Sequence, residues 1–189
     1  MTKLLIKRFI KDYENTQNSD VRTAYGKFSS IVGIVCNAIL FISKLIVGTL
    51  SASVSITADA VNNLSDASSS IISLLGFKLA SRPADEEHPY GHGRYEYLSG
   101  LMVAVLIMVI GVELFKSSLD KVLHPSAVEF SWVTVGVLAF SILLKTWMAL
   151  FNTKTGKMIN SNTLIATAAD SRNAVSYTHL RAHETKANL

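Results

Sequence analysis

The stretch from Val54 to Ala80, VSITADAVNNLSDASSSIISLLGFKLA, decides how the rest of the chain is arranged. It is apolar enough to lie in a membrane as a helix, yet it carries Asp59, Asn62, Asn63 and Asp66 near its middle. Ionisable groups at membrane depth are costly, so they normally face a bundle interior or a water-filled path and mark function. The stretch therefore predicts a helix of a membrane bundle with its polar face turned inward.

The polar residues of this stretch share one helical face. At about 100° per residue, Asp59, Asn62 and Asp66 fall within roughly 60° of one another. Asn62 and Asp66 stand at positions i and i+4, where two oxygen-bearing side chains can reach a single cation. We interpret the face as half of a divalent-cation site in a membrane transporter. The alternative is a seam between helices that is held by hydrogen bonds.

Further apolar blocks predict an all-α membrane protein, an antiparallel bundle of transmembrane helices. About 23 residues at 1.5 Å each are enough to cross a hydrocarbon core of about 30 Å. We expect four full spans and the start of a fifth, at 28–50, 54–80, 97–119, 130–152 and 161–175. Lys44 and Lys145 lie near the ends of their spans, and we expect both to extend toward the interface. For Lys44, pairing with a carboxylate of the second span is the alternative.

The composition agrees with a membrane protein and argues against other classes. The 189 residues are 49% hydrophobic and 17% charged, whereas about a quarter of the residues in a typical soluble domain are charged. The net charge of +4 is not gathered on one predicted face, which argues against a nucleic-acid partner. The single cysteine excludes an internal disulfide and any multi-cysteine zinc motif. Neither an activated nucleophile pairing nor a cofactor motif is apparent, so we expect no enzyme and no bound cofactor.

The two ends of the chain differ from its apolar middle. Segment 1–27 is polar and basic, and we expect a cytoplasmic segment that lies on the membrane surface or stays flexible. Basic residues are concentrated before the first span and after the second and fourth spans, which predicts a cytoplasmic N-terminus. We expect the membrane to be the cell membrane. Segment 176–189, SYTHLRAHETKANL, cannot complete a span because its polar groups would lie in lipid. We interpret it as foreign to the fold, so that the fifth span is truncated.

A second candidate site lies in the loop 81–96, SRPADEEHPYGHGRYE, which is dense in charge, proline and glycine. Asp85, His88 and His92 supply carboxylate and imidazole groups, which can ligate zinc or a similar metal. The alternative is that the histidines are solvated turn residues. Because this loop follows the second span, a cytoplasmic N-terminus predicts that the loop is cytoplasmic as well.

Three segments together resemble the cation diffusion facilitator family: ADAVNNLSD at 58–66, RPADEEHPYGHGRYE at 82–96 and TAADSRN at 167–173. The resemblance covers about 28–173. It implies a homodimeric antiporter with six spans and a cytoplasmic C-terminal domain, which expels divalent metal from the cytoplasm in exchange for protons. It also favours metal binding by Asp85, His88 and His92, because some members of the family bind a second metal in this loop.

The resemblance implies a transport site made of two residues four apart in span two and two more in span five. Here these are Asn62, Asp66 and Asp170, and the fourth ligand is expected at position 174, where this sequence has Ala174. We attribute that departure to the foreign tail, and we expect these 189 residues alone not to transport. Asp59 is expected to line the path or to hydrogen-bond within the bundle.

The oxygen donors of this site favour Mn²⁺ over softer metals, and relatives with Asn or Asp at the position of Asn62 resemble manganese exporters. Zn²⁺ or Fe²⁺ export is the alternative within the family. Clustered carboxylates in a dry site repel one another and hold protons when empty, and a divalent cation displaces those protons. A non-transporting membrane scaffold is the competing hypothesis from another class.

Overall fold

The computed structural model describes residues 2–10, 12–50, 54–123 and 132–187. This part of the chain forms helices and connecting turns without strands, which confirms the all-α prediction. The six helices are α1 (Thr2–Phe9), α2 (Ser19–Leu50), α3 (Val54–Ala80), α4 (Arg94–Leu123), α5 (Trp132–Met158) and α6 (Asn162–Ala187).

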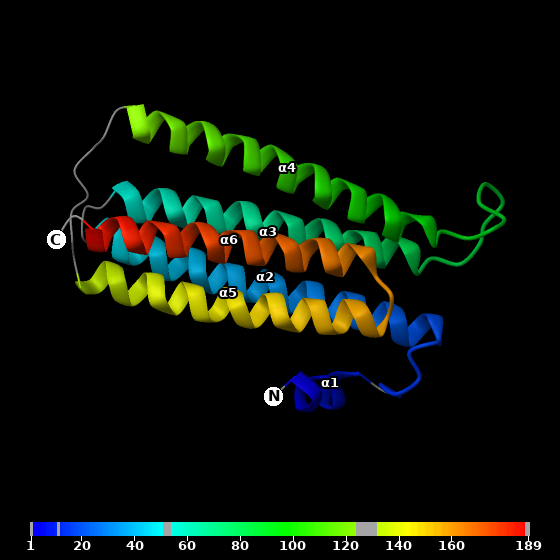
Figure 1. Ribbon diagram of the computed structural model, residues 1–189. Helices are drawn as coiled ribbons and strands as arrows, with labels where there is room; N and C mark the ends of the chain where they lie inside the picture. Colours follow the sequence, from blue (N-terminus) through cyan, green and yellow to red (C-terminus); the bar gives the residue numbers. More distant parts are fainter. Residues whose placement is uncertain (1, 11, 51–53, 124–131, 188–189) are drawn as a thin grey trace.

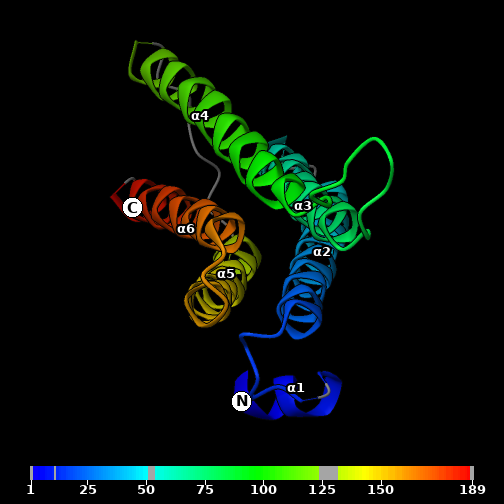
Figure 2. The same ribbon diagram turned by 90° about the vertical axis from the view of Figure 1, so that its right-hand side faces the viewer.

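Helices α2 to α6 run side by side and alternate in direction, as Figure 1 shows. Helix α3 packs against α2, α4 and α6, and α5 packs against α2 and α6. Seen along the bundle, α4 diverges from α5 (Figure 2). The predicted antiparallel bundle is therefore present, with α4 on its outside.

Three helices of the described chain are long and apolar enough to cross a membrane: α2, the Arg94–Glu113 part of α4 and the Val135–Met158 part of α5. Helix α3 has 27 residues, which at 1.5 Å each gives about 40 Å. It is less apolar than these three helices, because it carries polar side chains that are buried against neighbouring helices. The helix bounds reach beyond several predicted spans; α2, for example, begins at Ser19, where Asn18 Oδ1 accepts a hydrogen bond from the Asp20 amide at 2.8 Å. The membrane boundaries themselves stay predictions.

Small residues allow the helices to approach closely. A Cβ added at Gly33 of α2 would lie 2.5 Å from Ser70 Oγ of α3. A Cβ added at Gly76 of α3 would collide with the Ser99 side chain of α4. Such contacts between small residues replace the hydrophobic effect as a source of helix association in lipid. They fix α3 between α2 and the first turns of α4.

Helix α1 lies against the side of the bundle, below α5 in Figure 1. Its Ile6, together with Ile10 beyond it, is buried in a cluster with Tyr25, Phe77 and Leu164. The N-terminal segment is thus folded onto the bundle, whereas we expected it to lie on a membrane surface or to stay flexible. The sequence showed the apolar stripe of α1 but not the apolar side of the bundle that receives it.

Helix α6 continues to Ala187, past residue 175, where the predicted fifth span ends. Its last turns contain Leu, Arg, Ala, Glu and Lys, which favour helix without any apolar pattern. Helix formation by this segment does not depend on where its sequence came from. Its foreign origin therefore stays a prediction.

Candidate functional site

One face of α3 is buried along the middle of the bundle and is almost entirely polar. Its members recur every three or four residues, as the helical period requires: Asp59, Asn63, Asp66, Ser70 and Ser73. Because α3 lies between α2, α4 and α6, this face meets other helices rather than the surroundings of the bundle. Two members of the predicted face, Asp59 and Asp66, are buried inside the bundle, whereas Asn62, the third, is only half-buried and Asn63 occupies the buried position.

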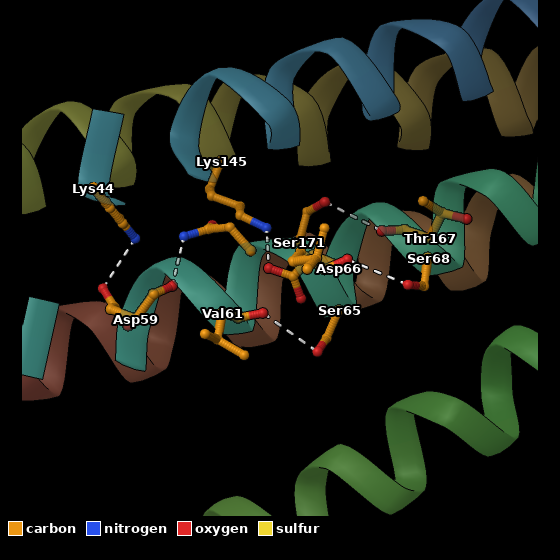
Figure 3. Close-up of polar contacts among 11 residues, drawn as sticks. Lys44, Asp59, Val61, Ser65, Asp66, Ser68, Lys145, Thr167 and Ser171 are labelled. Atoms are coloured by element: carbon orange, nitrogen blue, oxygen red, sulfur yellow. Dashed lines mark hydrogen bonds and ion pairs between the residues drawn. The ribbon is translucent and has the colours of Figure 1, made fainter. Parts of the chain in front are cut away.

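Asp66 makes an ion pair with Lys145 of α5. The Lys145 ammonium donates to Asp66 Oδ2 at 2.5 Å, and each side chain is only 4% exposed. Figure 3 shows the lysine reaching across from α5 to the carboxylate on α3. Our expectation that Lys145 extends toward the interface is wrong: its side chain points into the bundle, where a buried anion attracts it.

Asp59 makes a second buried pair, with Lys44 of α2. The two groups lie 2.9 Å apart, and Asn63 Nδ2 donates to the backbone carbonyl of Asp59 at 2.8 Å (Figure 3). Lys44 therefore takes the alternative that we had left open, pairing with a carboxylate of the second span. The pair accounts for Asp59 as a structural group within the bundle.

Asp170 of α6 is buried close to the same centre. The charges of Asp66 and Lys145 both interact with the Asp170 carboxyl group, and Ser69 lies beside it. Thr167, one turn earlier, exchanges a hydrogen bond with Ser73 of α3 at 3.1 Å, which holds α6 against α3 at this level. The two carboxylates that we selected on separate helices thus lie close enough to interact. The side chain of Lys145 reaches this centre from α5.

Asn62 is half-buried on α3, one turn before Asp66. Ala174 is half-buried on α6, one turn after Asp170, so that a longer side chain there would start from the same side of the helix. The described interior also contains oxygen atoms that complete no hydrogen bond with the described residues: Asn37 Oδ1, Ser69 Oγ, Ser70 Oγ and Asn152 Oδ1. Buried oxygens of this kind can solvate a cation that enters the bundle.

The loop between α3 and α4 forms the second cluster. Asp85, His88 and His92 each offer one ligand atom, and these atoms lie within 4.8 Å of one another. Asp85 Oδ1 lies 3.2 Å from His88 Nδ1, and its Oδ2 lies 3.4 Å from His92 Nε2. The turn that brings them together includes Gly91, whose φ of +75° suits glycine.

The donor set of this loop fits a metal ion. The His92 Nδ1 lies 3.1 Å from the carbonyl oxygen of Pro83, which leaves Nε2 for a metal, an arrangement typical of metal-ligating histidines. The backbone N–H of His88 donates to Asp85 and lowers the pKa of that carboxyl group. Asp85 is consequently an anion at neutral pH. Two imidazoles and a carboxylate are a ligand set that Zn²⁺ accepts, with a fourth position open.

Sequence reasoning missed Lys145 as a member of the central site. Its signal was a lysine inside the apolar run ILLKTWMAL, two turns from the end of the predicted span. That position allows the side chain either to reach the interface or to turn inward. The location of Asp66 on α3, within reach of the lysine, decides between the two.

Comparison with known proteins adds an independent line. A family model described as the cation efflux transmembrane domain matches residues 30–179. An uncharacterized transporter of Methanocaldococcus jannaschii is 36% identical over 138 residues, which cover 73% of this chain and 49% of the relative. The manganese efflux system proteins MneS and MneP of Bacillus subtilis are 30% and 28% identical, over 78% and 75% of this chain and 51% and 47% of their own lengths. The chain spans about half the length of these relatives.

Proposed function

Since this chain belongs to the cation efflux family, also called the cation diffusion facilitators, we propose that the protein carrying it exports divalent metal ions from the cytoplasm. The observation that supports this most is the pair of buried carboxylates, Asp66 and Asp170, on neighbouring helices. Buried carboxylates are costly unless they are paired or bind a cation. Two of them around a single lysine leave a net negative charge, which attracts a divalent ion.

We propose that Asn62, Asp66 and Asp170 ligate the transported ion, with a fourth ligand at position 174 in the complete site. The donors are one amide oxygen and carboxylates, which are hard ligands and suit Mn²⁺ better than they suit softer metals. The names of the two Bacillus relatives, which are manganese efflux proteins, agree with this choice. Zn²⁺ and Fe²⁺ are the alternatives.

We propose that export is coupled to proton entry. Two carboxylates in a dry site repel one another, which favours a proton on one of them when no metal is present. A divalent cation favours the ionised form of both and displaces the proton. The metal ion and the proton then occupy the same oxygen atoms in turn, so that metal exit is coupled to proton entry.

The loop cluster of Asp85, His88 and His92 is proposed as a second metal site on the cytoplasmic side. The basic segments that predict a cytoplasmic N-terminus lie at the same end of the bundle as this loop (Figure 1). We also propose that the complete protein is a homodimer, as the family resemblance implies.

The test is Mn²⁺ uptake into sealed vesicles that contain this chain completed to the length of its relatives. Asp66→Asn is expected to abolish uptake because it removes a carboxylate ligand and its charge. The matched control, Asp20→Asn, removes an exposed carboxylate at the start of α2 and is expected to retain uptake. Equal uptake by wild type and Asp66→Asn would remove the transport site, and no uptake above empty vesicles by any variant would favour a scaffold.

A further inference from the structure

Lys145 is a cation already present at the proposed transport site. Its ammonium lies 2.5 Å from Asp66 Oδ2, and its charge also interacts with the Asp170 carboxyl group. It belongs to α5, whereas the two carboxylates belong to α3 and α6. A positive charge thus reaches the carboxylates from a third helix, at the oxygen atom that a metal ion would need.

Stability alone is a poor explanation for this lysine. Removing two charges from water is costly, and a well-packed apolar pair of the same volume is often as stable or more so. The bundle also contains a second buried pair, Lys44 with Asp59, which already ties α2 to α3. Unlike Lys44, Lys145 pairs with a carboxylate that we propose as a metal ligand.

We propose that Lys145 is the resident counter-ion of the transport site, which holds Asp66 between metal loads and is displaced when metal arrives. The inference rests on the proposed function, and it adds a positioning residue that competes with the cargo. Metal binding must break the Lys145–Asp66 pair, so the site binds metal less tightly than its oxygen ligands alone would. The same pair re-forms when the metal leaves, which favours release.

The proposal predicts opposite effects on affinity and on turnover. Lys145→Met removes the competing charge, so Mn²⁺ should bind about tenfold more tightly, because a unit charge close to a buried site acts through a low effective dielectric. Transport by the same variant should show a lower KM together with a lower maximal rate, since release becomes slower. A residue that only supports the fold would lower the maximal rate without tightening binding.

Two variants control for the loss of a buried ion pair and for side-chain size. Lys44→Met breaks the other pair, at Asp59, and is expected to change the Mn²⁺ Kd by less than about threefold, because that charge lies farther from Asp66 and Coulomb energy falls with distance. Lys145→Arg keeps the positive charge, and its Kd is expected to stay close to that of the wild type.

Binding is measured by the loss of the free Mn²⁺ EPR signal on the completed protein in detergent, after gel filtration has shown each variant to be monodisperse. Tighter binding by Lys145→Met but not by Lys44→Met supports the proposal. If Asp66→Asn abolishes binding but the Kd of Lys145→Met is unchanged or higher than that of the wild type, the proposal is overturned. The proposed function is then left standing. Absence of Asp66-dependent binding in the wild type would remove both.

A measurement on the wild type remains decisive if Lys145→Met does not fold. In a structure of the completed protein with Mn²⁺ bound, Lys145 Nζ is expected to have moved out of hydrogen-bond distance of Asp66. Retention of the Lys145–Asp66 pair beside a bound Mn²⁺ ion would overturn the proposal, because the two cations would then not compete.

Discussion

Breaking the buried pair between Lys44 and Asp59 should show how the bundle tolerates charge. At 2.9 Å and an effective dielectric constant of about 20, their attraction is about 6 kcal/mol. Most of this is offset by the desolvation of both groups. Lys44→Met leaves Asp59 buried without its cation and is expected to lower the free energy of unfolding by about 3–5 kcal/mol.

Replacing both partners should largely restore the stability. The double variant Lys44→Met/Asp59→Leu has no unpaired charge, and its free energy of unfolding is expected within about 2 kcal/mol of the wild type. The assay is SDS-induced unfolding of the purified protein, followed by the loss of helical circular dichroism. If the double variant is as unstable as the sum of the single variants, the two residues do not act as a pair and the reasoning fails.

Three further predictions concern single positions. Ala174→Asp adds a carboxylate one turn after Asp170 and should tighten Mn²⁺ binding about tenfold; an unchanged Kd in the EPR assay would argue against a fourth ligand there. Gly33→Leu should lower the free energy of unfolding by about 1–3 kcal/mol through overpacking, whereas Gly111→Leu should not, because a Cβ added there would meet no other described side chain or helix within 4 Å; equal SDS midpoints would contradict the close contact. His92→Ala should reduce bound Zn²⁺ by one ion per chain while Mn²⁺ uptake continues, and an unchanged metal content would remove the loop site.

The sequence was sufficient for those features that depend on one helix or one loop. The period of Asp59 and Asp66 identified the buried face of α3 because a helix has a fixed geometry. The spacing of Asp85, His88 and His92 allowed one turn to bring all three together. In both cases the residues that matter are close in the chain, so local geometry decides their arrangement.

Features that depend on the neighbouring helix could not be predicted. Lys145 pairs with Asp66 across 79 residues, and the apolar run around the lysine does not reveal which helix faces it. The burial of Ile6 in a cluster with Tyr25 was hidden for the same reason, since an apolar stripe fits a membrane surface as well as the side of a bundle. The family resemblance supplied the pairing of Asp66 with Asp170, and periodicity alone would not have done so.

Anomalous scattering at the manganese edge, from crystals of the completed protein grown with Mn²⁺, tests the central claim most directly. The account predicts a peak within coordination distance of Asp66 and Asp170, in the interior of the bundle. A protein that binds Mn²⁺ only at the loop or at its surface, with no peak between these two carboxylates, would contradict it.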